Sequence, residues 1–402
     1  MKKKVLVFSH ALEIGGAERA LLGLLESFDY TRYNVDLFLM RHEGELFQNI
    51  PEHVNLLPPI KEYTGLATPM TSLIKKGLFN IAFGRIKAKR KAHSFLKNHQ
   101  ITGDNAVELE YSHKYTKRYM PKINDTEYDL AISFLTPHYL VAEKVNAKKK
   151  IAWIHTDYSY IKIDTESEYE MWGKYDYIAS ISDDCTKGFC GQFPTLKDRI
   201  IPIENISSIE FIKQQADKND MQSVFTETKS IKLLSIGRFC HQKNFDNVPD
   251  ICTRIIDEGI DVKWFLIGFG ADEDLIKAKI SEAGMEGNVI ILGKTDNPYP
   301  YIKNCDLYIQ PSRYEGKAVT IREAQILNKP IVITNYPTSS SQLDDGFDGV
   351  VVPLDNERCA TGIIQVLQNK SLIDKLIDNT KKTDYSNSKE IEKLYNIIEQ
   401  RN

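Results

Sequence analysis

Short apolar runs recur along the whole chain, and segments of helical length separate them. The runs are rich in Val, Ile and Leu and lie at residues 5–8, 35–40, 130–134, 151–154, 177–180, 200–203, 231–236, 262–267, 289–292, 307–310, 331–334 and 350–352. Strands that are apolar throughout are typical of a parallel sheet covered on both faces. Strands that alternate with helices predict βαβ units, and hence a doubly wound α/β fold.

The number of predicted strands also bears on domain organisation. Twelve strands are too many for one small sheet, so we expect two. We place the boundary near Ile206, in the polar stretch after the sixth run. Residues 1–206 and 207–384 would then form two Rossmann-like domains. Residues 385–402 show the apolar spacing of an amphipathic helix, which we expect to pack back on the N-terminal domain.

The composition narrows the class of protein. It is 42% hydrophobic, 10% aromatic and 27% charged, as in ordinary globular proteins. A net charge of −3 argues against nucleic acid as a partner. There is no apolar run of about eighteen residues, so no transmembrane helix is expected, and residues 5–8 are too short for a signal peptide. The six cysteines lack a Cys-x-x-Cys pair, which predicts reduced thiols and no zinc site.

A pair of glycines follows the first run. Gly15 and Gly16 precede a helical pattern over residues 20–28. Glycines between a strand and a helix let backbone N–H groups approach a phosphate, and the helix dipole favours the negative charge. The full dinucleotide fingerprint is absent, so a tight turn without a ligand is the alternative.

Two cations follow the seventh run. Arg238 and Lys243 come directly after residues 231–236, and ligands of open α/β sheets lie beyond the carboxyl ends of the strands. The guanidinium fork and the ammonium point charge together suit a diphosphate. A pair of solvated surface cations is the alternative interpretation.

A polar loop follows the tenth run. Glu315 lies in this loop, and Glu323 lies in the first turns of a helix expected from about Val319. Carboxylates accept hydrogen bonds from the hydroxyls of a ribose or a sugar, whereas Lys317 and the first amides of the helix would face an anion. Thr320 and Glu323 also form Thr-x-x-Glu, so a capping box with a purely structural carboxylate is the alternative.

These features, taken in order, resemble the family-four retaining glycosyltransferases of the GT-B fold that build bacterial polysaccharides and glycolipids. The resemblance rests on the Glu-x7-Glu pattern, the glycine turn, Gly-Arg followed by Lys-Asn, and residues 342–349. It covers nearly the whole chain, weakly over residues 56–124. It implies two Rossmann-like doubly wound parallel-sheet domains facing each other across a cleft, with the acceptor on the N-terminal side and the nucleotide sugar on the C-terminal side.

The resemblance also implies roles for single residues. Glu315 would contact the transferred sugar, and Glu323 would bind the donor ribose. His155, after residues 151–154, matches a family histidine that contacts the sugar near the reacting centre; a hydrogen-bonded structural histidine is the alternative. The donor diphosphate would be held by Gly16, Arg238, Lys243, Lys317 and the amides around Ala318, Val319 and Thr320. Many relatives have an apolar residue and then proline where this chain has Lys317 and Ala318, which leaves the sugar undetermined.

The implied reaction is retaining transfer of a hexose from a nucleotide diphosphate sugar, UDP-sugar rather than GDP-mannose, to a saccharide or lipid-linked acceptor. Cations and a helix N-terminus would stabilise the leaving diphosphate, which would itself help to deprotonate the acceptor. We therefore expect no metal and no cofactor. A non-catalytic sugar-nucleotide-binding scaffold, a nucleotide-sugar epimerase and a phosphorylase remain alternatives on the same frame.

Basic side chains crowd one segment of the N-terminal domain. Residues 63–103 hold eight Lys or Arg and no Asp or Glu, and five of these cations follow an apolar stretch. The pattern over residues 74–97 favours an anionic membrane surface, and so a cytoplasmic enzyme peripheral on the inner face of the membrane. Cations interrupt the apolar stripe, so a solvated helix face that packs on the domain is the alternative. That stripe consists of Ile74, Leu78 and Ala82.

Overall fold

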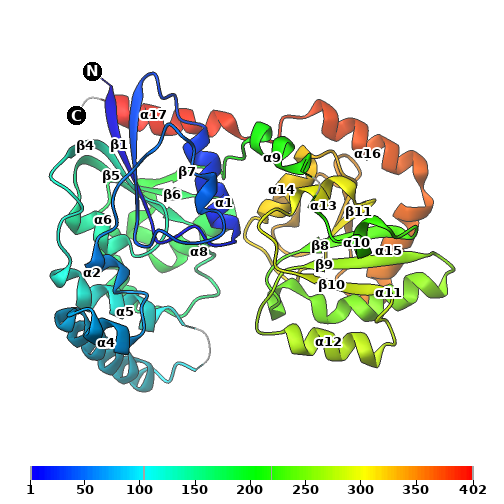
Figure 1. Cartoon of the computed structure of the whole chain (residues 1–402), viewed down its shortest axis with the longest axis horizontal. Coiled ribbons are helices and arrows are strands. Elements are labelled where there is room, and N and C mark those ends of the chain that lie inside the picture. The colour runs from blue at the N-terminus through cyan, green and yellow to red at the C-terminus, as the bar shows by residue number, and fades with distance from the viewer. Residues whose placement is uncertain (1, 103–104, 219, 401–402) are drawn as a thin grey trace. The chain divides into compact units, whose positions relative to one another are not determined.

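The chain folds into two compact units, each built around its own parallel sheet (Figure 1). The structure, a computed structural model, describes residues 2–102, 105–218 and 220–400. The N-terminal lobe comprises Met1–Ile206 and Lys389–Asn402, and the C-terminal lobe comprises Ser207–Ser388. The prediction of two α/β domains with parallel sheets is confirmed.

The N-terminal lobe has seven parallel strands in the order β3-β2-β1-β4-β5-β6-β7. The strand order reverses between β1 and β4, and ligands of such sheets lie beyond the carboxyl ends of the strands at this switch point. Apolar side chains fill both faces, as in Val5–Phe8, which are fully buried. The strands are β1 (Lys3–Ser9), β2 (Tyr33–Leu39), β3 (Asn55–Leu56), β4 (Glu127–Ser133), β5 (Asn146–Ile154), β6 (Tyr177–Ser180) and β7 (Ile200–Pro202).

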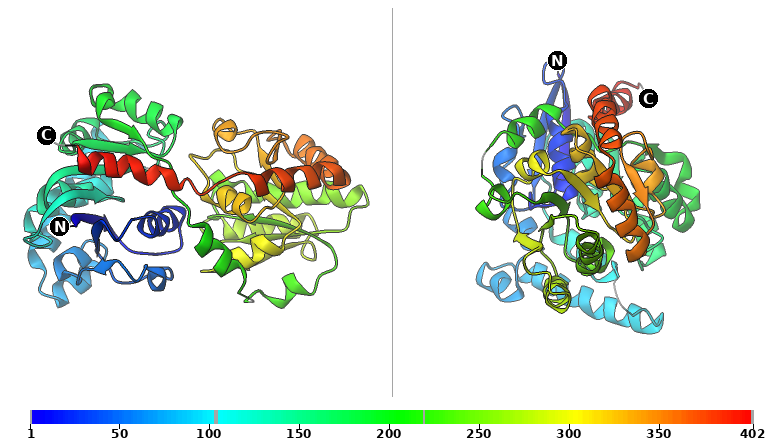
Figure 2. Two further views of the ribbon diagram at one scale, coloured as in Figure 1. Left: turned by 90° about the horizontal axis from the view of Figure 1, so that it is seen from above. Right: turned by 90° about the vertical axis from the view of Figure 1, so that its right-hand side faces the viewer.

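Helices cover this sheet, and the last helix of the chain is one of them. Figure 2 shows α17, in red, beside this lobe. Leu394 and Ile397 of α17 lie in the core of the lobe. The Lys149 ammonium on β5 donates to the carbonyl oxygens of Ile397 (2.8 Å) and Gln400 (2.6 Å). The helices are α1 (Gly16–Glu26), α2 (Lys61–Thr64), α3 (Met70–Lys75), α4 (Phe79–Asn98), α5 (Val107–Thr116), α6 (His138–Lys144), α7 (Thr165–Trp172), α8 (Asp183–Gln192) and α17 (Ile391–Glu399).

The C-terminal lobe has six parallel strands in the order β10-β9-β8-β11-β12-β13, and its switch point lies between β8 and β11. The strands are β8 (Ile231–Ile236), β9 (Val262–Ile267), β10 (Val289–Gly293), β11 (Leu307–Gln310), β12 (Ile331–Thr334) and β13 (Val350–Val352). The helices are α9 (Ile209–Ala216), α10 (Ser223–Thr226), α11 (Val248–Asp257), α12 (Glu273–Glu282), α13 (Tyr299–Asn304), α14 (Val319–Ile326), α15 (Asn356–Gln368) and α16 (Lys370–Lys382).

Each of the twelve apolar runs forms a strand, so that prediction is confirmed. The structure adds β3, which has only two residues and joins the edge of the sheet beside β2. Asn55 is exposed and Leu56 is half-buried, so β3 lacks the continuous apolar run that marks a central strand.

Two of the three residues in the interrupted apolar stripe pack on the lobe, as the alternative interpretation of the basic segment expected. Leu78 and Ala82 are buried in the lobe, and only Ile74 of the three is exposed. The exposed apolar side chains of α4 instead follow the spacing i, i+4, i+7 on another face. They are Phe79, Phe83 and Ile86.

Arg85 is also not the surface cation that the sequence suggested. Its guanidinium is half-buried and donates to the carbonyl oxygens of Gly65 (3.2 Å) and Thr68 (2.5 Å). Burial lowers its pKa below the usual value. Arg85 therefore ties α4 to the preceding loop. None of the helices that the structure describes is long and apolar enough to cross a membrane.

Candidate active site

Two loops meet at the switch point of the C-terminal lobe, one after β8 and one after β11. The Arg313 amide donates to the Gln242 carbonyl (2.8 Å), and the Asn244 side chain donates to the Pro311 carbonyl (2.9 Å). Asn244 has a positive φ of 62°, a conformation that asparagine adopts more easily than most residues. These bonds fix the loops against each other.

A half-buried ion pair reinforces the junction. The Arg313 fork donates to both carboxylate oxygens of Asp246, at 2.9 and 2.7 Å, and also to the carbonyl of His241. Burial alone would raise the pKa of Asp246, but the Arg313 bonds outweigh it and hold this pKa below its usual value. A bidentate pair adds geometric precision as well as attraction.

The Lys243 side chain passes over Gly237 to the switch point. A Cβ on Gly237 would lie 3.0 Å from the Cδ and Cε atoms of Lys243, so the absent side chain leaves room for the lysine stem. The ammonium contacts Glu315 Oε1 at 2.5 Å, and both side chains are largely buried, with exposed fractions of 14% and 5%. The predicted donor-binding lysine and the predicted catalytic glutamate thus lie together.

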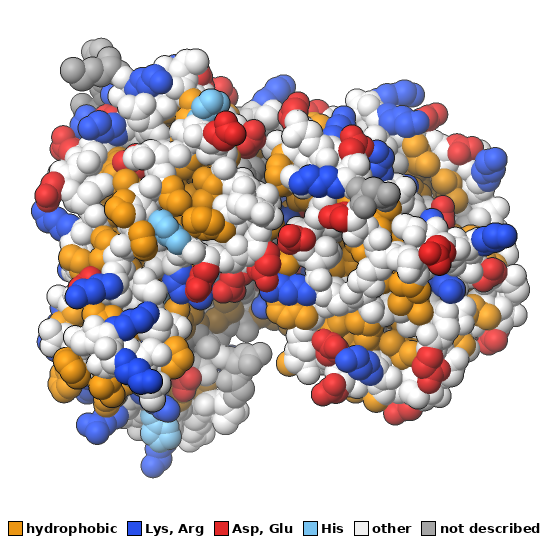
Figure 3. Space-filling view, viewed as in Figure 1, with side chains coloured by type: hydrophobic (Ala, Val, Ile, Leu, Met, Phe, Trp, Pro, Cys, Tyr) orange, Lys and Arg blue, Asp and Glu red, His pale blue; other side chains and the backbone are white. Residues whose placement is uncertain are grey.

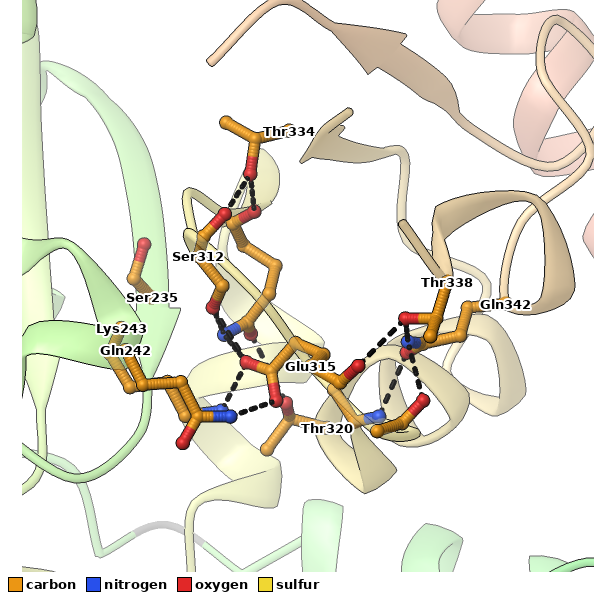
Figure 4. A network of polar contacts seen from close by, with 12 residues as sticks. Ser235, Gln242, Lys243, Ser312, Glu315, Thr320, Thr334, Thr338 and Gln342 are labelled. Carbon is orange, nitrogen blue, oxygen red and sulfur yellow. Dashed lines mark hydrogen bonds and ion pairs between the residues drawn. The ribbon is translucent and has the colours of Figure 1, made fainter. Parts of the chain in front are cut away.

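Glu315 is the centre of a polar network (Figure 4). Its Oε1 accepts from Lys243, from the Ser312 hydroxyl (2.6 Å) and from the Gln310 amide (3.2 Å), and its Oε2 accepts from the Gln242 amide (3.2 Å). The backbone carbonyl of Glu315 also accepts from a hydroxyl on the β12–β13 connection. Internal donors therefore satisfy this carboxylate, which orients Lys243.

The N-terminus of α14 adjoins this network. The Ala318 amide donates to Gln342 Oε1 at 2.8 Å, whereas the amides of Val319 and Thr320 have no acceptor among the residues that the structure describes. Two of the three amides predicted to face a phosphate are therefore available. Gln342 and Gly346 belong to the segment 342–349 that carried part of the family resemblance.

The capping-box alternative for Glu323 is wrong. Ala318 is the N-cap of α14, so Thr320 lies inside the helix, and its hydroxyl donates to Gln310 Oε1 (3.3 Å). Glu323 is 1% exposed and accepts from the Tyr299 hydroxyl at 3.1 Å. Its role at a ribose stays a prediction.

The remaining predicted cations differ in their surroundings. Arg238 is exposed at the carboxyl end of β8, and no hydrogen bond or ion pair to a described residue restrains it. Lys317 is half-buried beside the start of α14 and takes part in interactions there. Together with Lys243 they place three cations on the two loops that follow β8 and β11.

The glycine turn of the N-terminal lobe begins α1 as expected. Gly15 is the N-cap, Gly16 is the first helical residue, and a Cβ on Gly15 would lie 2.0 Å from a carboxylate oxygen of Glu18. The same carboxylate lies 3.8 Å from the imidazole of His10. Burial, which outweighs the other influences, lowers the pKa of His10. A carboxylate of the chain itself therefore lies over the turn where a phosphate was expected.

His155 follows β5 and lines a pocket of the N-terminal lobe with a volume of about 160 Å³. Its Nε2 atom is buried and has no partner among the described residues. Burial, followed by the proximity of His138, lowers the pKa of His155 to about 3. The imidazole is therefore neutral at physiological pH. The predicted contact with the transferred sugar stays a prediction.

Sequence reasoning missed the residues that hold Glu315 and those that share the pocket with His155. Gln310 carried a usable signal, because it ends an apolar run and Ser312 follows two residues later. Glu110 and Glu168 lie on α5 and α7, and nothing in their local sequence marks them as buried.

Within the described residues, no group of three or more His, Cys, Asp or Glu side chains is arranged to hold a metal ion.

Comparison with known proteins shows which enzymes the chain is similar to. Residues 216–383 match the model of the glycosyl transferases group 1. An uncharacterized glycosyltransferase of Methanocaldococcus jannaschii is 24% identical over 246 residues, covering 57% of this chain and 59% of that protein. The N-acetylgalactosamine-N,N'-diacetylbacillosaminyl-diphospho-undecaprenol 4-alpha-N-acetylgalactosaminyltransferase of Campylobacter jejuni is 28% identical over 181 residues, covering 44% and 47%. The chain thus spans about half the length of these curated relatives.

Solved structures share the fold over almost the full chain. Staphylococcus aureus TarM, crystallised with UDP, superposes with a TM-score of 0.69 at 15% identity and covers 99% of this chain and 100% of its own. Anabaena HepE in complex with UDP and glucose gives a TM-score of 0.68 at 16% identity, covering 98% and 99%. At these identities the likeness shows the fold alone, and that fold is the GT-B fold of glycosyltransferases. Residues 216–383, less than half of the chain, are similar to the group 1 family of glycosyl transferases.

Proposed function

We propose that the protein transfers a sugar, with retention, from a nucleotide diphosphate sugar to a saccharide or lipid-linked acceptor, without a metal ion. The observation that carries the proposal is the Lys243–Glu315 pair at the switch point, beside the available amides of Val319 and Thr320. Arg238 and Lys317 add two cations to the same loops. Such a set of fixed donors suits a diphosphate whose charge grows as the sugar leaves.

The network suggests how the donor is received. Glu315 keeps the Lys243 ammonium in place before the donor arrives, so little reorganisation is needed when the phosphates bind. A β-phosphate competes with Glu315 for this ammonium, while Ser312 and Gln310 continue to bond the carboxylate. Preorganised donors of this kind each contribute roughly 3 kcal/mol to transition-state stabilisation. The leaving phosphate then assists deprotonation of the acceptor hydroxyl on the same face of the sugar.

UDP-sugar is the donor that we favour, because Anabaena HepE was solved with UDP and with UDP-glucose. The proposed acceptor follows the names of the relatives. The Campylobacter protein is named for a diphospho-undecaprenol-linked acceptor, and a Staphylococcus aureus relative is a poly(ribitol-phosphate) alpha-N-acetylglucosaminyltransferase. A lipid-linked or polymeric saccharide is therefore the acceptor class that we propose.

A donor panel tests the proposal. UDP- and GDP-sugars are added to the protein, and the shift in unfolding temperature identifies the donor, because a ligand that binds only the folded state stabilises it. Transfer to a lipid-linked acceptor is then followed in EDTA, and the anomeric configuration of the product is read from NMR coupling constants. We expect activity in EDTA and a retained configuration. Donor binding without transfer would favour the scaffold alternative, and an altered donor sugar would favour the epimerase.

We also propose that α4 rests on an anionic membrane surface. Phe79, Phe83 and Ile86 are 63%, 58% and 45% exposed, and Arg90 and Lys97 continue the same helical face. Figure 3 shows hydrophobic side chains beside Lys and Arg on this part of the lobe. Apolar side chains can enter the headgroup region while each nearby cation contributes about 1 kcal/mol with anionic lipid. The enzyme would then be cytoplasmic and peripheral to the inner face of the membrane.

Liposome flotation tests this second proposal. Binding to vesicles that contain anionic lipid should fall with salt, and it should weaken when Phe79 and Phe83 become Ser or when Lys89, Arg90 and Lys91 become Gln. Arg85 is left unchanged, because its loss would disturb the fold of α4. Equal recovery of wild type and both variants with the vesicles, or of all three in the unbound fraction, would contradict a membrane role for α4.

A further inference from the structure

The pocket beside His155 contains polar atoms that the protein itself does not satisfy. Glu110 on α5 is 8% exposed, and Trp153 at the end of β5 is 3% exposed. Glu110 Oε2 and Trp153 Nε1 have no hydrogen-bond partner among the described residues, and both side chains line the pocket. Leaving such groups unpaired in the interior costs about 1–3 kcal/mol each, so a ligand or water is expected to complete them.

Contacts of one carboxylate oxygen fix the orientation of Glu110, so that the other oxygen can bind a ligand. Oε1 accepts from the Thr136 hydroxyl at 3.1 Å and lies 3.9 Å from His113 Nδ1. The other oxygen is left for a ligand. The pKa of Glu110 lies below its usual value, because the neighbouring His113 outweighs the effect of burial. The carboxylate is therefore ionised at neutral pH and accepts hydrogen bonds.

The charge of the lining selects the kind of ligand. Among the described lining residues there is no Lys or Arg, so a phosphate or diphosphate would meet only the negative charge of Glu110. Burial, followed by the nearby Glu110, raises the pKa of Glu168 to about 8. Glu168 is therefore largely a neutral acid at pH 7. The pocket suits a neutral, hydroxyl-rich group.

The side chains that line the pocket, and those at its opening, also suit a neutral, hydroxyl-rich group. Aromatic and aliphatic side chains, including Trp172 and Tyr158, form most of the lining, and Leu109 and Thr156 are exposed at its edge. Apolar walls with a few polar atoms are typical of small-molecule sites. A volume of about 160 Å³ corresponds to about five waters, which is enough for most of one sugar ring.

We propose that this pocket binds an uncharged sugar ring, with Glu110 Oε2 accepting from a sugar hydroxyl and Trp153 Nε1 donating to a sugar oxygen. Assigning this ring to the acceptor rests on the proposed function; the binding site itself does not. Glu110 would then determine which acceptor sugars the protein takes, and the charged linker of the acceptor would stay outside the pocket.

Tryptophan fluorescence tests the site with free sugars as probes. The chain has three tryptophans, of which Trp153 and Trp172 line the pocket and Trp264 lies in β9 of the other lobe. We expect a saturable change in emission with at least one of glucose, galactose, mannose, N-acetylglucosamine and N-acetylgalactosamine, with a Kd of the order of 1 to 10 mM. Glucose 6-phosphate should bind more weakly than glucose.

The variants separate a ligand site from a merely structural carboxylate. E110Q should weaken sugar binding at least about tenfold, a loss of roughly 1.4 kcal/mol, whereas E108Q, an exposed carboxylate on the same helix, should leave it unchanged. T136V keeps the charge and removes the orienting bond, so it should give an intermediate loss. UDP binding reports on the C-terminal lobe and should be equal in all variants.

The outcomes are distinct. Lack of a saturable response to all five sugars, or an equal Kd in wild type and E110Q, would overturn the pocket proposal and leave water as its occupant. Sugar binding that depends on Glu110, without UDP binding or transfer, would support the pocket and contradict the proposed function. Once transfer is measured, E110Q should raise the acceptor KM and leave the donor KM unchanged.

Discussion

Two buried glutamates illustrate how the lobes differ. Glu315 and Glu110 both lie beyond the carboxyl ends of parallel strands, and the exposure of the whole residue is 8% for each. Glu315 receives four hydrogen bonds from its own lobe, one of them from the Lys243 ammonium. In Glu110, Oε1 accepts a hydrogen bond from Thr136, whereas Oε2 has no partner among the described residues. A carboxylate with internal partners holds a cation in place, whereas one without them is completed by a ligand.

The same contrast extends to charge. The loops of the C-terminal site present Arg238, Lys243 and Lys317 and the amides at the start of α14, all of which favour an anion. The lining of the N-terminal pocket has no cationic side chain among its described residues. A diphosphate is therefore expected at the first site and a neutral ring at the second.

The largest effect is expected from removing the cation of the C-terminal site. K243A should lower the rate of transfer at least about a hundredfold, because a preorganised donor to the leaving diphosphate is lost. It should also destabilise the lobe by roughly 1–3 kcal/mol, because Glu315 loses its charged partner. Rate per folded molecule and thermal unfolding measure the two effects separately.

A matched control is K277A, which removes an exposed lysine of α12 that bonds its helical neighbour Glu273. K277A should change neither the rate of transfer nor the stability of the lobe.

E323A should also lower the rate about a hundredfold or more while the lobe stays folded. A variant that unfolds more easily but keeps its rate per folded molecule would show that Glu323 is only structural.

Glu168 offers the next effect, and it depends on pH. The folded state raises its pKa from 4.5 to about 8, so the folded protein holds a proton that the unfolded chain releases. The contribution of this group to stability is therefore complete below pH 4.5 and is lost as the pH rises to about 8. The glutamine of E168Q is neutral at every pH, so this variant does not lose stability at this position as the pH rises.

E168Q should accordingly be more stable than wild type by about 4 kcal/mol near pH 8 and about equal to it near pH 4.5. Its amide oxygen can still accept from Tyr158 and Trp172, which bond Glu168 Oε2 in the wild type. Urea unfolding at several pH values gives the comparison. A difference that does not change with pH would mean that Glu168 is ionised in the folded protein.

The smallest effect concerns the group that orients Glu323. Y299F removes the hydroxyl that donates to Glu323 Oε1 at 3.1 Å. The loss of one such bond is worth about 1 kcal/mol, or roughly a fivefold rise in the donor KM with little change in kcat. Steady-state kinetics with varied donor measure this split. An unchanged KM would indicate that Tyr299 does not position Glu323 for the donor.

The sequence predicts the fold better than it predicts the sites. Apolar runs identify central strands because burial on both faces requires them, but β3 at the sheet edge escapes this rule. Arg238, Lys243 and Glu315 could be found because loops after parallel strands carry them. Glu110 and Glu168 could not, since their burial arises when α5 and α7 pack over the ends of β4 and β5. Arg85 was predicted to be a surface cation for the same reason, since the sequence does not show the tertiary contacts that bury part of its side chain.

Calorimetric titration with UDP tests the central claim, which is that the loops after β8 and β11 hold a nucleoside diphosphate. Wild type should bind UDP without added metal, and K243A should bind it at least about tenfold more weakly, a difference of roughly 1.4 kcal/mol. E110Q, altered in the other lobe, should bind it as tightly as wild type. Equal affinity of wild type and K243A for UDP, or binding only when a divalent metal is added, would contradict the account.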